Sequence, residues 1–448
     1  MSSEGAEGSA AAKYAERRQR VLHALDGAAL VVATAPVRYK NADTEYRYRP
    51  DSDLLYLTGM SEPDGVLVLC GRPDEQRSVL FLAERNPAAE RWHGPRVGPE
   101  DGAERFGVDE ALPLASLPSA LGGLLSSADA VHYRTGASTE LDALVAGAIS
   151  AGRASRRRSG TGPTAVCDPS GVLDELRLRK DPSEVAIIRR ACSLTVAGHR
   201  AGLGAVAPGR GEWEVEATID ARFRAGGAFG AAFGTIVASG PNACVLHHTS
   251  NDRVIEDGDL VLIDAGAEVD FYSGDVTRTV PASGRFSPEQ RALYEVVEAA
   301  REAGVQAVAP GAAVSAPHAA ALDVMVTGLV ALGVLSGDRE EALADASFEA
   351  FIIHKTSHWL GLDVHDVGGY TSEGVARPLE PGMVLTVEPG IYIPVDSDAV
   401  PEAFRGLGVR IEDDVLVTPD GRENLTGELP SAPDEVEALM AELHDVQA

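Results

Sequence analysis

Short apolar runs separated by polar turns recur through the first part of the chain and predict buried strands. The expected elements are strands at residues 28–34, 66–70, 78–82 and 130–133, and helices at residues 117–126 and 141–151. This alternation of strands and helices predicts an α/β domain over residues 1–170. Its first 12 or so residues are expected to form a disordered leader, followed by a helix at residues 13–25.

A change in composition at residues 151–169, which are rich in Gly, Arg, Ser and Pro, predicts a linker to a second domain at residues 171–448. Asp181 and Pro182 mark the start of a helix there, because Pro suits the first helical turn and acids favour the N-terminus. The further expected elements are helices at residues 212–224, 288–308, 313–332 and 433–446, and strands within residues 233–281 and 383–418.

The chain has 448 residues, enough for two or three domains, and a formal net charge of −29. Nucleic acids and anionic membranes are poor partners for it, because phosphate groups bind to faces rich in Lys and Arg. No apolar run of about 18 residues predicts a membrane span, and no apolar segment near the start predicts a secretory signal. The cysteines stand far apart, which predicts reduced thiols in a cytoplasmic protein.

Two aspartates in the second half stand beside apolar runs and are candidate metal ligands. Asp264 ends the apolar run LVLID, and Asp275 follows after a short polar stretch. This interval fits a β-hairpin whose strands bring both carboxylates onto one face of a sheet. Gly266 and Gly274 would let the backbone bend close to an ion. A lone Asp at a strand end usually serves as a cap, whereas two in one hairpin favour a metal site.

Two glutamates further along the chain have similar apolar surroundings. Glu388 follows MVLTV and precedes Pro389, and a Glu in such a strand is costly to bury unless it is paired or bound to a metal. Glu412 lies in VRIEDD, two residues after Arg410. Residues two apart in a strand share a face, so Arg410 could orient a ligand or form a cross-strand salt bridge with Glu412.

Histidines concentrate in two segments near these acids. His354, His358 and His365 lie in HKTSHWLGLDVHD, and His247 and His248 lie in VLHHTSN. An HxxxH pair on a helix could bind zinc, but the glutamate of HExxH is absent and the glycine and β-favouring residues argue against one helix. We therefore expect one histidine to be a metal ligand and the others to lie around a substrate.

The ligand types indicate the metal and the reaction. Four carboxylates and one imidazole form a hard donor set, which suits Mn²⁺ or a similar ion better than a thiolate-rich zinc site does. Two such cations would cancel four buried negative charges that otherwise repel one another. Paired ions activate a water and stabilise an oxyanion, so the pattern predicts hydrolysis of an amide or ester.

The five motifs LIDAG, GDVTRT, HKTSHWLGLDVHD, LTVEPG and VRIEDD, in this order, resemble those of the pita-bread metallopeptidases, and most closely the Xaa-Pro aminopeptidase (aminopeptidase P) family. The segments RYRPDSDLLYLTG and ERWHGPRVG resemble its creatinase-like N-terminal domain. The resemblance implies an α+β fold class. A pita-bread catalytic domain would occupy residues 171–448, and an α/β creatinase-like domain residues 1–170.

The resemblance also implies residue roles around two divalent ions, which it identifies as Mn²⁺. Asp264 would chelate one ion, Asp275 and Glu412 would bridge both, and His358 and Glu388 would complete the other shell. Glu388 would also handle the proton of the bridging hydroxide. The substrate and supporting residues would be His247, His354, His365 and Arg410. Trp92 matches a position that reaches a neighbouring subunit's site, which implies a homotetramer or homodimer. Lys355 and His248 depart from the family pattern.

The implied activity is an aminopeptidase that releases the N-terminal residue from peptides with proline second. Prolidase, which cleaves only Xaa-Pro dipeptides, is the alternative with the same metal chemistry. Methionine aminopeptidase fits less well, because it does not need a large N-terminal domain. A metal-free relative, such as a creatinase-like hydrolase or a binding module, is a further alternative, although such proteins lose ligands that are present in this sequence.

Overall fold

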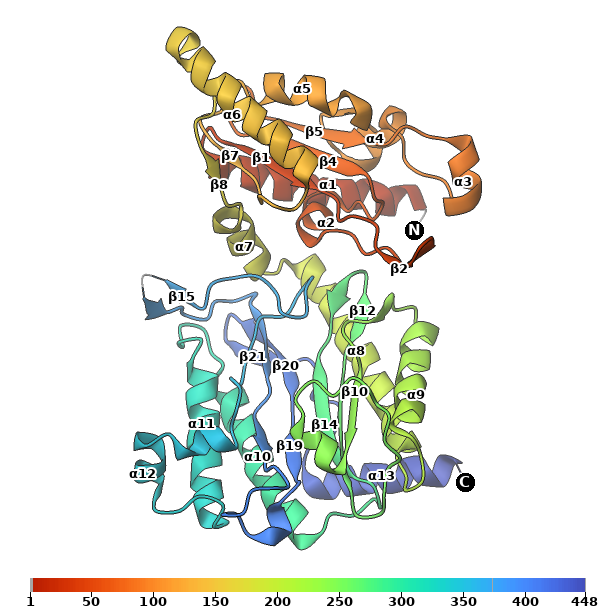
Figure 1. Ribbon diagram of the computed structural model, residues 1–448, viewed down its shortest axis with the longest axis vertical. Helices are drawn as coiled ribbons and strands as arrows, with labels where there is room; N and C mark the ends of the chain where they lie inside the picture. The colour runs from red at the N-terminus through yellow and green to blue at the C-terminus, as the bar shows by residue number, and fades with distance from the viewer. Residues whose placement is uncertain (1–2, 373, 448) are drawn as a thin grey trace. The chain divides into compact units, whose positions relative to one another are not determined.

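The computed structural model describes residues 3–372 and 374–447, which form two compact units (Figure 1). The first unit comprises residues 1–177 and the second residues 178–448. The assignment of the two domains to residues 1–170 and 171–448 stays a prediction. Among the described residues, no helix is long and apolar enough to cross a membrane.

The first unit is built on a six-stranded sheet with the order β6-β5-β4-β1-β7-β8. Its strands are β1 (Ala29–Ala33), β4 (Gly65–Cys70), β5 (Arg77–Leu82), β6 (Glu110–Pro113), β7 (Val131–His132) and β8 (Val166–Cys167). β4 pairs antiparallel with β1 and β5, whereas β6, β7 and β8 join in parallel. The four strands expected in this region are confirmed, and β6 and β8 are additional.

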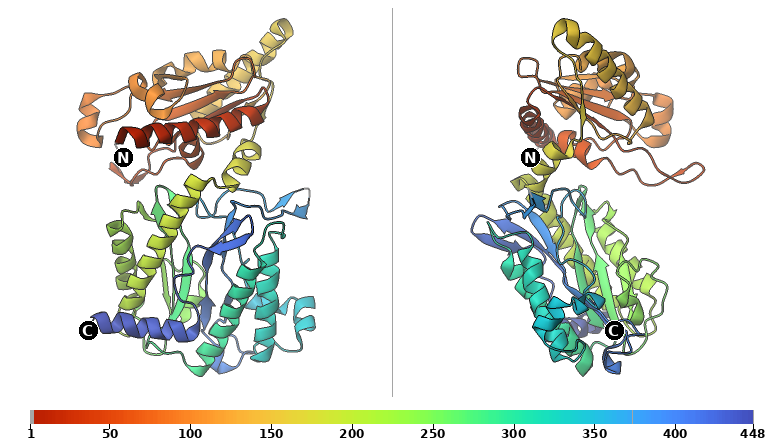
Figure 2. Two further views of the ribbon diagram at one scale, coloured as in Figure 1. Left: turned by 180° about the vertical axis from the view of Figure 1, so that it is seen from behind. Right: turned by 60° about the vertical axis from the view of Figure 1, so that its left-hand side comes forward.

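Helices cover both faces of this sheet (Figure 2). The helices α5 (Leu117–Leu124) and α6 (Thr139–Ser159) share one apolar core with the strands, and α1 (Ser3–Leu25) lies on the other face. Shorter helices complete the unit: α2 (Ser52–Thr58), α3 (Pro87–His93), α4 (Pro99–Phe106) and α7 (Ser170–Leu178). A small hairpin joins β2 (Tyr39–Asn41) to β3 (Thr44–Glu45).

Two expectations for this unit are wrong. The expected disordered leader is helical from Ser3, since its residues are rich in Ala, the strongest helix former. Only residues 1–2 lie outside the described part of the leader. The expected linker at residues 151–169 begins as the end of α6, whose Arg side chains suit a helical C-terminus, and then supplies β8 to the sheet.

The second unit places two pairs of helices around antiparallel strands (Figure 1). α8 (Pro182–Ala205) and α9 (Glu212–Ala225) lie on one side, and α10 (Pro288–Ala307) and α11 (Ala316–Ala331) lie on the other. Two further helices, α12 (Arg339–Ala344) and α13 (Pro433–Gln447), follow them in the chain. Residues of α8, α9, α10 and α11 pack with the strands in one apolar core.

The strands between these helices form several small antiparallel sheets. One has the order β10-β11-β14, a second β13-β12-β9, a third β17-β20-β21, and a fourth pairs β18 with β19. Their bounds are β9 (Gly230–Ala231), β10 (Ile236–Ser239), β11 (Leu260–Ala265), β12 (Ala267–Val269), β13 (Tyr272–Ser273), β14 (Val276–Pro281), β17 (Val384–Val387), β18 (Gly390–Tyr392), β19 (Gly408–Arg410), β20 (Asp413–Thr418) and β21 (Gly421–Asn424). A two-stranded ribbon, β15 (Thr371–Ser372) with β16 (Val375–Ala376), lies before β17.

Local sequence explains where the long helices of this unit begin. The Asp181 side chain accepts hydrogen bonds from the backbone N–H groups of Ser183 and Glu184, and Pro182 occupies the first turn of α8. The Ser287 side chain caps α10 in the same way, accepting from the N–H of Gln290. These caps satisfy N–H groups that a helix leaves unpaired, and they confirm the expected start of α8.

Candidate metal centre

The hairpin expected around the two aspartates is confirmed. β11 pairs antiparallel with β14, and Asp264 lies directly opposite Thr277. Asp275 precedes β14 and is two residues from Thr277, so it points to the same face as Asp264. Gly266 has a different use from the expected bend around an ion. A Cβ added there would lie 1.7 Å from the carbonyl oxygen of Gly274, so this glycine allows two backbone segments to touch.

The two glutamates lie at breaks between strands rather than inside them. Glu388 follows β17 directly, and its N–H donates to the carbonyl of Thr356 at 2.8 Å. Glu412 lies between β19 and β20, and its N–H donates to the carbonyl of Thr277 at 3.0 Å. The Thr277 hydroxyl also donates to Glu412 Oε2 at 2.6 Å. These backbone and side-chain hydrogen bonds together fix Glu412 beside the β11–β14 hairpin.

The histidine segment has no helix, which removes the zinc-binding helical pair as an interpretation. Its backbone is held along β17 instead. The N–H of Thr386 donates to the carbonyl of His358 at 2.9 Å, and the His358 N–H donates to the Thr386 hydroxyl at 3.1 Å. Trp359 is fully buried and stacks on Tyr370, with ring centroids 5.4 Å apart. An irregular segment is thereby held in one conformation.

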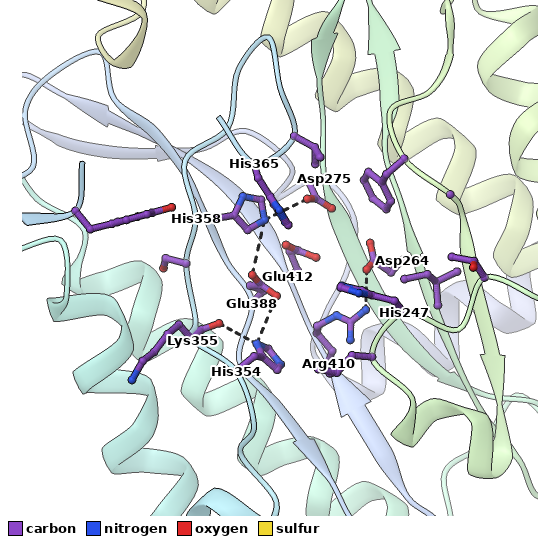
Figure 3. Close-up of a pocket in the computed structure, with 18 residues that line it drawn as sticks. His247, Asp264, Asp275, His354, Lys355, His358, His365, Glu388, Arg410 and Glu412 are labelled. Carbon is purple, nitrogen blue, oxygen red and sulfur yellow. Dashed lines mark hydrogen bonds and ion pairs between the residues drawn. The ribbon is translucent and has the colours of Figure 1, made fainter. Parts of the chain in front are cut away.

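All nine predicted site residues line one cavity of about 610 Å³ (Figure 3). They are His247, Asp264, Asp275, His354, His358, His365, Glu388, Arg410 and Glu412. Lys355 lines the same cavity, whereas His248 does not. His248 is buried, and its Nε2 lies 3.0 Å from Oε2 of the buried Glu212. Glu212 also accepts from the N–H groups of Ser239 and Arg253, so it fixes the loop that carries His247.

Burial and then neighbouring charges raise the pKa values of three carboxyl groups in the cavity. Burial raises the pKa of Asp275 well above its usual range, and the charges of Asp264 and Glu388 add to the rise. Burial and then Asp275 do the same for the pKa of Glu412. Burial raises the pKa of Glu388 to about 7, although His358 and Arg410 oppose that rise. Without added positive charge, ionised carboxylates here are costly.

The donor set fits divalent cations. Ligand atoms of Asp275, His358 and Glu412 all lie within 4.8 Å of one another. His358 Nε2 is 3.7 Å from Glu388 Oε1. The buried Oδ1 of Asp264 has no hydrogen-bond partner among the residues that the structure describes. An unsatisfied buried oxygen beside clustered carboxylates is expected where a metal ion, rather than a protein donor, completes the site.

Arg410 is buried and binds the other carboxylate oxygen of Asp264, Oδ2. Its Nη2 donates to Asp264 Oδ2 at 2.6 Å, its Nη1 to the Tyr392 hydroxyl at 2.9 Å, and its Nε to the Thr277 hydroxyl at 3.1 Å. The salt bridge of Arg410 is therefore with Asp264, and not with Glu412 as the sequence also allowed. Arg410 holds one carboxylate and its surroundings together.

Tyr392 and Thr277 contact site residues, and the sequence argument missed both. The Tyr392 hydroxyl accepts from Arg410 and lies 2.8 Å from His354 Nε2, so it is placed to donate its proton there. His354 Nδ1 lies 2.8 Å from the carbonyl of Lys355, which fits a neutral ring with the proton on Nδ1. Burial, and then the charge of Arg410, lower the pKa of His354 to about 4. The two-residue spacing of Thr277 from Asp275 was the available signal for Thr277.

A model of the metallopeptidase family M24 matches residues 186–419, and one of the aminopeptidase P N-terminal domain matches residues 14–133. The chain belongs to metallopeptidase family M24. This M24 metallopeptidase is 42% identical to the Xaa-Pro aminopeptidase of Escherichia coli over 96% of this chain and 97% of the relative. It is 38% identical to that of Haemophilus influenzae, with 96% and 97% covered.

Solved structures of similar sequence have the same fold. The Pseudomonas aeruginosa aminopeptidase PepP matches the M24 metallopeptidase with a TM-score of 0.93 at 42% identity, covering 97% of this chain and 99% of the other. A zinc-substituted E. coli aminopeptidase P in complex with product matches with a TM-score of 0.92 at 41% identity, covering 97% and 98%. The expected fold class, a pita-bread domain joined to an aminopeptidase P-type N-terminal domain, is confirmed.

Proposed function

We propose that this M24 metallopeptidase is a two-metal aminopeptidase that removes the N-terminal residue from peptides with proline at the second position. The observation that carries the proposal is the meeting of four carboxylates and His358 in one cavity, with three further histidines around them. Near full-length similarity to proteins named Xaa-Pro aminopeptidase supports the choice of substrate.

Five side chains would hold the two ions: Asp264, Asp275, His358, Glu388 and Glu412. Bound divalent cations supply Lewis-acid polarisation of the scissile carbonyl and a water acidic enough to act as a nucleophile. Oxygen-rich ligation supports Mn²⁺ as the resident ion. Asp275 and Glu412 would both help to hold the ions, and the charge of Asp275 adds to the rise in the pKa of Glu412.

The remaining cavity residues would bind and orient the peptide. His354 is neutral and fixed by the Tyr392 hydroxyl, so it keeps a defined face toward the substrate. His247 and His365 line the same cavity and would contact the carbonyl on the proline side or the developing oxyanion. Glu388 would accept and return a proton during the cleavage. Arg410 would keep Asp264 oriented.

Proline at the second position changes the bond that is cleaved. Its nitrogen carries no hydrogen and its φ is fixed, so a site that needs an N–H donor from the substrate rejects it. Release of alanine from Ala-Pro-Ala by the Mn²⁺-loaded chain, with much slower release from Ala-Ala-Ala, is the expected result. No release from Ala-Pro-Ala by a folded chain with bound metal contradicts the proposal. Cleavage of Ala-Pro but not of Ala-Pro-Ala favours prolidase instead.

Assembly and location complete the proposal. A homotetramer or homodimer is supported by Trp92 on α3, because this large apolar side chain is 86% exposed in the single chain. Light scattering of the purified chain tests the assembly, and a monomeric mass contradicts it. The four cysteines are free thiols, which supports a cytoplasmic protein. The domains are proposed at residues 1–170 and 171–448.

A further inference from the structure

Lys355 is a cation on the wall of a cavity that is otherwise rich in carboxylates and histidines. Among the described residues that line the cavity, Arg410 and Lys355 are the cations. Arg410 is buried and already paired with Asp264 at 2.6 Å. Lys355 is exposed, and no carboxylate of the described residues lies within ion-pair distance of it, although the chain has 68 acidic residues and 39 Lys and Arg. Its positive charge is therefore available to a ligand.

The backbone of Lys355 is fixed beside the catalytic cluster. The carbonyl of Lys355 lies 2.8 Å from His354 Nδ1, and the carbonyl of the next residue, Thr356, accepts from the N–H of Glu388 at 2.8 Å. The residue is thus attached on one side to a histidine that lines the cavity and on the other to a candidate metal ligand. Its side chain starts from a defined point near the reacting groups.

A neutral imidazole positions the Lys355 ammonium without cancelling its charge. Lys355 Nζ lies 3.4 Å from His318 Nε2, and His318 Nδ1 lies 2.9 Å from the hydroxyl of the buried Thr356. Burial, and then the charge of Lys355, lower the pKa of His318, so this ring is neutral near pH 7. A neutral Nε2 can accept a hydrogen bond from Nζ while the ammonium keeps its full positive charge.

The charges along the cavity match the two ends of a short peptide. In Figure 3, Asp264 and His247 lie on one side of Glu388, and Lys355 lies on the other, with its side chain directed away from the carboxylates. The two proposed ions cancel the four carboxylate charges, so Lys355 sets the direction by repelling the substrate's ammonium and attracting its carboxylate. A peptide that enters amino end first toward Asp264 therefore directs its carboxyl end toward Lys355.

We propose that Lys355, held by His318, forms a carboxylate-binding subsite at the rim of the cavity and makes this enzyme favour peptides that present a carboxylate at the third residue. The inference rests on the proposed aminopeptidase function. Two sources offer this group: the C-terminal carboxylate of a tripeptide, and an acidic side chain in third position. Lys355 is a specificity-determining residue in this proposal and takes no part in the bond cleavage.

Three substrates separate these possibilities in the Mn²⁺-loaded full chain: Ala-Pro-Ala, its C-terminal amide, and Ala-Pro-Asp-amide. The free tripeptide is expected to exceed its amide in kcat/KM by about fivefold, chiefly through KM, because a partly exposed ion pair contributes up to about that factor. A similar gain for Ala-Pro-Asp-amide supports a side-chain source. Equal kcat/KM for all three substrates overturns the proposal.

Variants then assign the preference to the subsite. Lys355→Met is expected to abolish the preference, so that the free tripeptide falls to the kcat/KM of its amide, whereas Lys355→Arg retains most of the preference. His318→Ala is expected to weaken the preference by releasing the ammonium. Arg285→Met, which removes an 86% exposed cation elsewhere, controls for net charge and leaves the preference intact. A loss of equal size for all three substrates in Lys355→Met contradicts the subsite. Absence of alanine release from every substrate by the wild-type chain instead contradicts the proposed function.

Discussion

Glu412 and Asp413 are adjacent acids that are both buried, yet their electrostatic surroundings are opposite. Glu412 faces the cavity, where burial and then the charges of Asp275 and Glu388 raise its pKa well above the usual range. Asp413 faces the other way and lies 2.8 Å from Arg278 and 2.9 Å from Arg301. Burial alone would raise the pKa of Asp413, but these two cations outweigh it and lower that pKa.

The difference separates a structural acid from an acid that needs an external cation. Asp413 also accepts hydrogen bonds from Asn424 and Thr426, so its charge is satisfied inside the fold. The Glu412 carboxylate accepts a hydrogen bond from the Thr277 hydroxyl and has other acids as neighbours. Residue type and burial are the same in kind, so the placement of arginines distinguishes the two roles. The comparison yields four predictions.

The largest effect is expected on stability when Asp413 is removed. Asp413→Ala leaves Arg278 and Arg301 buried without their shared carboxylate, and breaking a buried ion pair in this way costs about 3–5 kcal/mol of unfolding free energy. Urea unfolding of the metal-free chain measures this loss. Glu428→Gln, at an exposed position, serves as the control and should change the free energy by less than about 0.5 kcal/mol. A loss for Asp413→Ala no larger than that of the control means that the arginines do not depend on it.

Removing Glu412 should have the reverse pattern, with activity rather than stability affected. Glu412→Gln deletes one of the candidate ligands and is expected to lower kcat/KM by more than about 100-fold, since residues that only support metal ligands already account for 10–100-fold. The metal-free variant should be at least as stable as the parent, because it lacks one of the mutually repelling carboxylates. Metal content by atomic absorption and urea unfolding test both parts. Unchanged activity, or a stability loss as large as that of Asp413→Ala, contradicts the contrast.

Metal removal should reveal the repulsion directly through its dependence on pH. The folded-state pKa of Glu388 is raised from 4.5 to about 7, so its contribution to the stability of the metal-free chain is full below pH 4.5 and is lost as pH rises through 7. The raised pKa values of Asp275 and Glu412 act in the same direction. Mn²⁺ replaces protons on these oxygens, so the increase in Tm on adding Mn²⁺ should be larger at pH 8 than at pH 6.

The expected gain is about 2.7 kcal/mol when free Mn²⁺ is 100 times its dissociation constant. Calorimetry of the chain with Mn²⁺ and with a chelator gives the two Tm values at each pH. Glu412→Gln provides the control, because its gain should be smaller and depend less on pH. A gain that is equal at pH 6 and pH 8 contradicts the assignment of the raised pKa values to the metal-binding carboxylates.

The smallest effect is expected from the hydroxyl that connects Arg410 to His354. Tyr392→Phe removes one hydrogen bond on each side and should lower kcat/KM about tenfold, corresponding to about 1.4 kcal/mol. The metal content should not change, since the hydroxyl contacts no candidate ligand. Tyr294→Phe, which removes another buried hydroxyl that donates to the Ser431 carbonyl, should leave kcat/KM unchanged. Equal losses in both variants indicate a general packing effect.

The fold was predictable where apolar runs are long and poorly predictable where elements are short. β1, β4 and β5 consist almost entirely of buried residues and are read directly from the chain. β8 has two residues and β6 is half-exposed, so neither has enough apolar signal to be recognised. The extension of α6 is hard to predict because clustered Arg and Ser are also typical of linkers, although Arg is a good helix former.

The candidate site was predictable as a set of residues but not as a set of contacts. Its nine side chains are marked by polar groups beside apolar runs and by the order of their motifs, and all nine line one cavity. The partner of Arg410 is 146 positions away on β11, and that of Lys355 is 37 positions away on α11. Such pairings arise from how strands and helices pack, and one sequence carries no local signal for them.

The spread of the candidate ligands along the chain has a consequence for synthesis on the ribosome. The sheet of the first unit is complete once β8 has emerged, and domains commonly fold as units from the N-terminal end. The candidate ligands come from separate segments, the first being Asp264 and the last Glu412. A growing chain therefore cannot assemble the full ligand set until nearly all of the second unit has been made. With the proposed ligand set, peptide hydrolysis cannot begin before Glu412 has been added to the chain.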